Sequence, residues 1–101
     1  MKIVAVTSCA TGIAHSYMAA EALKEAAKAE GDEIKVEIQG AMGIENPLSE
    51  KDIQEADLVI WAVDVGVRRK GRFDGKGVVK FNPNEVIHDS KKMLRKAKGE
   101  D

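Results

Sequence analysis

Residues 3–18 read IVAVTSCATGIAHSYM, and this stretch decides the fold. Its first five residues are apolar or β-branched, which predicts a short strand buried on both faces. Residues 19–28 are dense in strong helix formers, so we expect a helix from about Ile13 to Ala29. Spacing of i, i+4 predicts that its buried stripe consists of Ala14, Met18, Ala22, Leu23 and Ala26. A strand, a loop of small residues and a helix, in this order, indicate the first unit of an α/β sheet.

The only cysteine of the chain, Cys9, lies in the loop between this strand and this helix. Open α/β sheets bind ligands at the carboxyl ends of their strands. Because small residues follow the cysteine, backbone N–H groups can turn inward as an anion nest, and the helix dipole adds about half a positive charge. We therefore expect a thiol with a lowered pKa that attacks or carries an anionic group. The alternative for a lone cysteine is a small buried hydrophobic residue.

Length and composition predict one soluble globular domain covering residues 1–101. Apolar residues make up 44% of the chain and charged residues 33%, as in folded proteins. The formal net charge of -1 argues against nucleic acid as a partner. No run approaches 18 apolar residues and the chain enters a strand at once, so we expect no membrane span and no signal peptide. A single cysteine and two distant histidines predict no disulfide and no metal site, which suits the cytoplasm.

The remaining periodicities predict three further strands and two further helices. Residues 33–38 alternate strictly, as an edge strand wet on one face does, whereas residues 57–63 are nearly all apolar and indicate a central strand. We expect a loop over 39–47 at the same sheet edge as Cys9, a fourth strand over 77–81, and helices over about 49–56 and 83–97. Ser49 with Asp52 three residues later approximates a capping box at the start of the helix over 49–56. This order predicts an α/β fold with a four-stranded parallel open sheet, strand order 2-1-3-4, and helices on both faces.

A basic segment, residues 68–76, follows the predicted central strand and carries five cations against one acid. It begins at the sheet edge where Cys9 is expected. A rim formed by Arg68, Arg69 and Arg72 would therefore steer an acidic partner or an incoming anion toward the cysteine. The alternative is a solvated loop with a distorted helical turn.

Several anion-binding chemistries fit this loop poorly. The single glycine, Gly12, does not make a dinucleotide-binding G-x-G-x-x-G motif, and no Walker Gly-Lys-Ser/Thr is present. A flavodoxin-like FMN site is weakly indicated, because the chain has few aromatic residues. The Cys-x5-Arg loop of low-molecular-weight phosphatases would need arginine where His15 stands, and no Asp-Pro acid is present. A nest without hydrolytic groups should accept a phosphoryl group and keep it until another acceptor arrives.

Residues 5–23 closely resemble the fructose-type enzyme IIB domain of the bacterial sugar phosphotransferase system. The resemblance continues in order through nearly the whole chain, at residues 36–40, 43–46, 56–57 and 72–73. Ala10 and Ser16 are mild departures, because family members often carry proline and threonine there. Residues 60–71 depart more.

The resemblance implies a phosphotransferase that needs no cofactor and works in the cytoplasm, free-standing or joined to an inner-membrane permease. Cys9 would take a phosphoryl group from a phosphohistidine of enzyme IIA, as S-phosphocysteine, and pass it to a sugar held by membrane enzyme IIC. The implied phosphate-binding residues are Ala10, Thr11, Gly12, Ile13, Ala14, His15 and Ser16. A phosphatase-like or arsenate-reductase-like enzyme and a non-catalytic anion-binding module are the alternatives.

Overall fold

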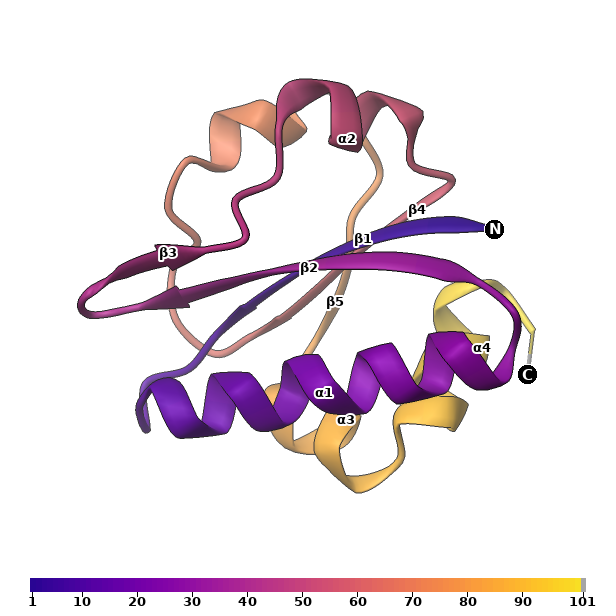
Figure 1. Cartoon of the computed structure of the whole chain (residues 1–101), viewed down its shortest axis with the longest axis horizontal. Coiled ribbons are helices and arrows are strands. Elements are labelled where there is room, and N and C mark those ends of the chain that lie inside the picture. Colours follow the sequence, from indigo (N-terminus) through magenta and orange to yellow (C-terminus); the bar gives the residue numbers. More distant parts are fainter. Residues whose placement is uncertain (101) are drawn as a thin grey trace.

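The computed structural model describes residues 1–100 and is built on a five-stranded sheet (Figure 1). Its strands are β1 (Lys2–Ser8), β2 (Glu33–Gly40), β3 (Gly43–Glu45), β4 (Leu58–Val63) and β5 (Val79–Phe81). Their spatial order is β3-β2-β1-β4-β5. The pairs β2/β1, β1/β4 and β4/β5 are parallel, and β3 is antiparallel to β2. The predicted α/β class and the order of the four parallel strands are confirmed.

Helices cover both faces of the sheet, as predicted (Figure 1). On one face lie α1 (Ile13–Ala29), α3 (Pro83–His88) and α4 (Ser90–Ala97), and on the other lie α2 (Glu50–Glu55) and the short 3-10 helix η1 (Lys70–Phe73). Alternation along β1 serves both layers: Ile3 and Ala5 join the core under α1, and Val4 and Val6 join the core under α2. No helix within residues 1–100 is long and apolar enough to cross a membrane.

The prediction of four strands with 33–38 at the edge is wrong, because residues 39–47 are not simply a loop. The chain turns back after Gly40, and β3 pairs with β2 through the registers Gln39↔Ile44 and Gly40↔Gly43. Gly43 has a φ of 141°, which only glycine adopts easily, and this permits the tight return. Strand β2 is therefore internal, and its Glu37 is fully buried.

The buried stripe of α1 and the length of the last helix also differ from the prediction. Ala14 and Met18 are exposed, whereas Ser16, Ala19 and Ala20 face the sheet, because small side chains let the helix approach it closely. The expected helix 83–97 is broken at Asp89, whose non-helical backbone (φ −151°, ψ 75°) separates α3 from α4 and whose carboxylate accepts the Lys92 N–H. The predicted cap of α2 is confirmed: Ser49 and Asp52 form a reciprocal capping box.

Candidate phosphate-binding site

Cys9 follows β1 directly, at the carboxyl edge of the sheet and between the ends of β2 and β4. Its side chain is half-buried. The chain then turns sharply: the Gly12 N–H donates to the Cys9 carbonyl (3.3 Å), and the Ser16 N–H donates to the Gly12 carbonyl (3.4 Å). Gly12 is the residue before α1 and has a φ of 120°, so a glycine is needed at this turn. The loop therefore leads β1 straight into the first turn of α1.

The turn leaves several backbone donors free at its open side. Within residues 1–100, no acceptor takes the N–H groups of Thr11, Ile13, Ala14 or His15. Ala10, Thr11, Gly12, Ile13 and Ala14 are all exposed, so these donors are accessible from solvent. Helix N-termini with free N–H groups attract anions because the dipole of the helix adds to the hydrogen bonds. All the sequence-predicted phosphate-binding residues are brought together here.

Buried side-chain atoms beside this loop also lack partners. The Oγ of Ser16 and the Oγ1 of Thr7 are enclosed, and neither makes a hydrogen bond of ordinary geometry in the described chain. The Nε2 of His15 is in the same condition. Most buried polar groups in proteins are paired, so three unpaired atoms next to one loop indicate a place where a polar ligand binds. Thr7 was not among the site residues predicted from the sequence.

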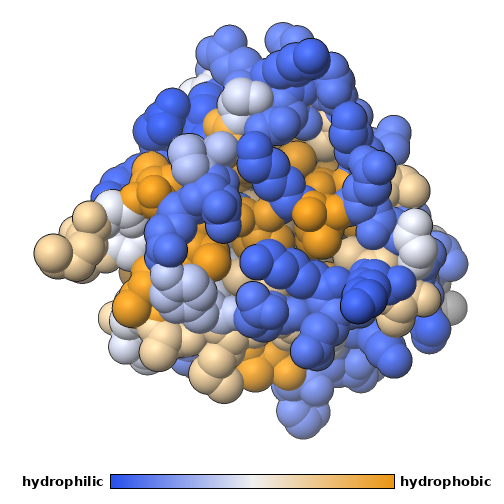
Figure 2. All heavy atoms as spheres, viewed as in Figure 1, coloured by the Kyte–Doolittle hydropathy of each residue, from blue (hydrophilic) through white to orange (hydrophobic). Residues whose placement is uncertain are grey.

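The hairpin of β2 and β3 forms a wall opposite the loop. Between them lies a hollow of about 470 Å³, lined by Cys9, Ala10, Gly12 and Ile13 on one side and by residues 40–45 on the other. Met42, at the tip of the hairpin, is fully exposed. The left end in Figure 2, where Figure 1 shows this hairpin and the end of β1, is richer in pale and orange atoms than the strongly blue top and right. The sequence placed residues 39–47 at the edge of Cys9 but did not predict a wall.

The thiol of Cys9 does not have the lowered pKa that the sequence predicted. Burial raises the pKa of Cys9, the nearby Ser16 hydroxyl lowers it by a smaller amount, and the Asp64 carboxylate raises it further. The prediction was wrong because it counted the nest and the helix dipole and left out both desolvation and this carboxylate.

Asp64 is a site residue that sequence reasoning missed. It follows β4 directly, its N–H donates to the Ser8 carbonyl (3.1 Å), and its Oδ1 accepts the Ala10 N–H at 2.7 Å. A carboxylate thus lies on the first backbone donor after the cysteine. Its position right after the central strand was the available signal, since the carboxyl ends of neighbouring parallel strands meet.

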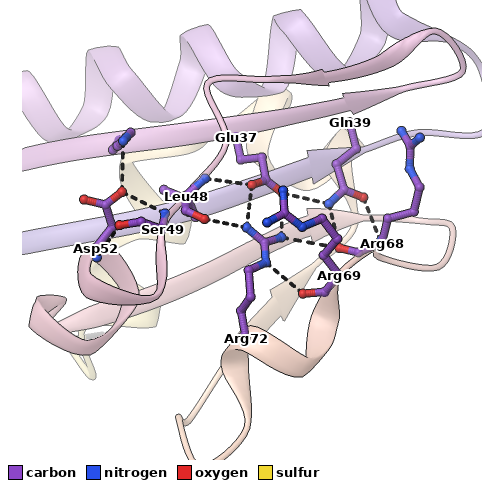
Figure 3. Close-up of polar contacts among 9 residues, drawn as sticks. Glu37, Gln39, Leu48, Ser49, Asp52, Arg68, Arg69 and Arg72 are labelled. Carbon is purple, nitrogen blue, oxygen red and sulfur yellow. Dashed lines mark hydrogen bonds and ion pairs between the residues drawn. The ribbon is translucent and has the colours of Figure 1, made fainter.

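A second polar cluster lies at the same sheet edge, behind the hairpin, and it contains Arg72 (Figure 3). The Arg72 guanidinium donates to both carboxylate oxygens of Glu37, at 2.7 and 2.9 Å, and to the Leu48 carbonyl at 2.7 Å. The Arg72 side chain is 8% exposed and that of Glu37 is 0% exposed. The expectation that Arg72 belongs to a solvent-facing rim is therefore wrong: it pairs with a buried carboxylate that the sequence pattern placed in water.

The charged groups of Glu37 and Arg72 in this cluster are paired with each other. Burial raises the pKa of Glu37, but hydrogen bonds from Arg72, Gln39 and the Leu48 N–H outweigh burial, and the net shift of the pKa is downward. Gln39 also holds the backbone of Arg68, accepting its N–H at 2.9 Å and donating to its carbonyl at 3.0 Å. The Arg68 guanidinium in turn donates to the Gly40 carbonyl, so the cluster fixes the hairpin wall. Arg69 is exposed, with a φ of 58°.

Comparison with known proteins places this site in context. The family described as "PTS system, Lactose/Cellobiose specific IIB subunit" matches residues 4–96. The PTS system fructose-like EIIB component 2 of Escherichia coli (strain K12) is 47% identical over 95 residues, covering 94% of this chain and 90% of the relative. The PTS system fructose-specific EIIB'BC component of Rhodobacter capsulatus is 48% identical over 100 residues, which are 99% of this chain and 17% of that protein.

A solved structure agrees with these relatives. The solution structure of the enzyme IIB subunit of the PTS system from Escherichia coli K12 superposes with a TM-score of 0.90 at 37% identity. The match covers 96% of this chain and 90% of that one. The two chains therefore share one overall fold over almost their whole length.

Proposed function

Because the chain belongs to the enzyme IIB family of the sugar phosphotransferase system, we propose that it carries a phosphoryl group on Cys9 between two partner proteins. Its similarity to fructose-type EIIB components indicates a phosphotransferase of sugar uptake. The observation that carries the proposal is the loop after β1, where a half-buried thiol lies beside several unpaired backbone donors and three unpaired buried polar atoms.

Loading would proceed from a phosphohistidine of enzyme IIA. The bond between phosphorus and the histidine nitrogen breaks, a bond between phosphorus and the Cys9 Sγ forms, and the thiol proton passes to the released nitrogen. Burial and the Asp64 carboxylate raise the pKa of Cys9, so the proton has to leave the sulfur as the bond to phosphorus forms, and the released histidine nitrogen takes it. The hollow of about 470 Å³ beside Cys9 leaves room for a ring from the donor protein.

The chain's own groups would hold the phosphoryl oxygens after transfer. The free N–H groups of residues 11 and 13–15 point to an anion at the start of α1, and the Ser16 and Thr11 hydroxyls add donors. His15 has an unpaired Nε2 and would act as a donor or a cation. Such transfer depends mainly on positioning and on stabilising charge, which a preorganised loop supplies.

The same residues argue against hydrolysis. His15 stands where a Cys-x5-Arg phosphatase loop has its arginine, and the chain has no Asp-Pro general acid of the kind such phosphatases use. Water attacking phosphocysteine would therefore lack that arginine to stabilise charge and that acid to transfer a proton, a contribution typically worth about 10²–10⁴-fold. The phosphoryl group should remain on the protein until an acceptor arrives.

Unloading would occur to a sugar held by membrane enzyme IIC. The name of the Rhodobacter capsulatus relative joins B and C components in one protein, which supports a partner of this kind and a place at the membrane surface. The exposed cations Arg68 and Arg69 keep the proposed role of steering a partner. Arg69 is the cleaner probe of the two, since Arg68 also holds the hairpin.

The direct test is labelling by a phosphohistidine donor. Purified protein is mixed with phosphorylated fructose-type enzyme IIA, and phosphate on Cys9 is located by mass spectrometry under neutral conditions. We expect one phosphoryl group on Cys9 and none on Cys9→Ser, whose fold is checked by its amide spectrum. Labelling of Cys9→Ser at a comparable rate would overturn the proposal.

A further inference from the structure

The hydrogen bond from the Ala10 N–H to the Asp64 carboxylate joins two groups that both lie in the candidate site. The Ala10 N–H would be the first backbone donor available to a phosphoryl group on Cys9, yet it donates to a carboxylate at 2.7 Å. Asp64 forms no ion pair with any cation within residues 1–100. An uncompensated negative charge therefore lies where a second negative charge must be accommodated.

The backbone of Asp64 is held in place, so the carboxylate cannot move far away. Its N–H donates to Ser8 in the neighbouring strand, and β4 pairs with β1 up to Ser8↔Val63. Four residues later, Gln39 holds the backbone of Arg68 through both its N–H and its carbonyl. Only rotation of the Asp64 side chain can separate the carboxylate from a phosphoryl group, and the exposed position permits this short movement.

We propose that Asp64 is a positioning residue that makes the phosphoryl group on Cys9 transferable. In the unloaded protein its carboxylate orders the loop by accepting the Ala10 N–H. In the loaded protein a phosphoryl oxygen takes that N–H, and the displaced carboxylate repels the phosphoryl group from a few ångströms away. The repulsion raises the free energy of the loaded state, so the group leaves readily for an acceptor. This inference rests on the proposed carrier function.

The isosteric variant Asp64→Asn separates the charge from the hydrogen bond. Its amide oxygen still accepts the Ala10 N–H, so the loop keeps its order while the repulsion disappears. Asp74→Asn is the matched control, because Asp74 is an exposed aspartate whose side chain makes no ion pair or hydrogen bond among residues 1–100. Asp64→Ser is a second variant that removes the same charge with a shorter side chain.

The first measurement uses inorganic phosphate as the probe and requires no partner protein. Phosphate is titrated into each variant and followed by amide shifts, and thiolate absorbance gives the pKa of Cys9. We expect Asp64→Asn and Asp64→Ser to bind phosphate roughly tenfold more tightly than the parent protein. Both should have a lower thiol pKa, whereas Asp74→Asn should match the parent in both quantities. Unchanged affinity and unchanged thiol pKa in both Asp64 variants would overturn the inference.

The second measurement uses the phosphohistidine donor. At a fixed ratio of donor to protein, Asp64→Asn should shift the equilibrium constant roughly tenfold toward phosphocysteine and should discharge more slowly. An equal equilibrium constant in Asp64→Asn and the parent would overturn the inference. If the parent protein takes no label at all, the carrier function fails, and the phosphate and thiol measurements still decide whether Asp64 acts on the loop.

Discussion

Two polar regions lie at the carboxyl edge of this sheet, and they differ in whether their polar atoms are hydrogen-bonded. In the cluster around Glu37 and Arg72, each charged group has a close partner, and the hydrogen bonds run continuously from β2 to η1 (Figure 3). In the loop after β1, the N–H groups of residues 11 and 13–15 and the buried atoms of Thr7, His15 and Ser16 make no hydrogen bond of ordinary geometry within residues 1–100. The first region holds the fold together, and the second keeps its hydrogen-bonding capacity for a ligand.

The physical cost makes this contrast informative. Leaving a buried polar group unpaired costs about 1–3 kcal/mol, so a fold rarely accumulates such groups without a reason. The Glu37 carboxylate shows that this protein can satisfy a buried charge fully when only structure is needed. Unpaired atoms that gather beside Cys9 therefore point to binding.

The largest expected effect on stability comes from breaking the hydrogen-bonded cluster around Glu37 and Arg72. Arg72→Met leaves the Glu37 carboxylate buried without its partner and should lower the free energy of unfolding by about 3–5 kcal/mol, measured by urea denaturation. Arg69→Met is the matched control, because the exposed Arg69 contributes only its backbone carbonyl to Arg72; a change within about 0.5 kcal/mol is expected. A loss below about 1 kcal/mol for Arg72→Met would contradict the structural role of the pair.

Ser16 should behave in the opposite way. Ser16→Ala removes a buried hydroxyl that makes no hydrogen bond of ordinary geometry within residues 1–100, so the free energy of unfolding should stay the same or rise. Phosphoryl transfer should fall roughly ten- to a hundredfold through the loss of a donor to a charged group. Ser49→Ala provides the contrast: it removes a helix cap, should cost about 1 kcal/mol of stability, and should leave transfer unchanged. A Ser16→Ala protein that is less stable yet transfers normally would reverse the assignment.

A smaller effect is expected at His15. The His15 Nε2 is buried beside the loop and makes no hydrogen bond of ordinary geometry within residues 1–100, so the imidazole is available to a phosphoryl oxygen. His15→Gln keeps a hydrogen-bond donor in place of the imidazole and should slow transfer from the phosphohistidine donor severalfold. An unchanged transfer rate in this variant would make His15 a structural residue only.

The smallest expected effect concerns stability in acid. It involves Asp52, a carboxylate that has hydrogen-bond partners, as Glu37 does. The Ser49 N–H and the Lys35 ammonium lower the pKa of Asp52 to about 2, from an ordinary 3.8. The stabilisation from this carboxylate is thus fully present above about pH 4 and is lost as the pH falls from about 4 to about 2. Unfolding of the parent protein should become easier across this interval, and Asp52→Asn should weaken the trend. If the free energy of unfolding of the variant depends on pH as that of the parent protein does, the Asp52 carboxylate does not contribute to the loss of stability in acid.

Local signals in the sequence were enough to predict much of the fold. The bounds of α1, the cap of α2 and the order of the four parallel strands depend on helix propensity, capping residues and apolar runs, which act over a few residues. The short strand β3 was missed because three residues carry little periodicity. The break at Asp89 was missed because helix formers follow it immediately.

Errors at the site came from charges that pair across long sequence distances. Glu37 lies on a strand in which apolar and polar residues alternate, and this pattern predicts that its side chain faces water. The pattern cannot show the partner that allows its burial, because Arg72 is 35 residues away in sequence. The same reasoning assigned Arg72 to a solvent-facing rim. The thiol pKa was predicted in the wrong direction mainly because burial of the sulfur was left out. A smaller part of the error is the Asp64 carboxylate, which meets the loop through Ala10 although it is 54 residues from Ala10 in sequence. Patterns that are local in sequence identified the loop but not the charges that surround it.

The central claim is that Cys9 carries a phosphoryl group and that the protein does not hydrolyse this S-phosphocysteine. It is tested most directly by following one phosphorylated sample over time. The protein is phosphorylated by an excess of phosphohistidine donor, freed from the donor, and monitored by phosphorus NMR in buffer at pH 5 to 8. We predict that the phosphocysteine signal persists and then disappears when dephosphorylated enzyme IIA is added, with the group returning to histidine. Spontaneous release of inorganic phosphate within minutes, together with repeated turnover of p-nitrophenyl phosphate that is lost in Cys9→Ser, would contradict the carrier account and establish a phosphatase.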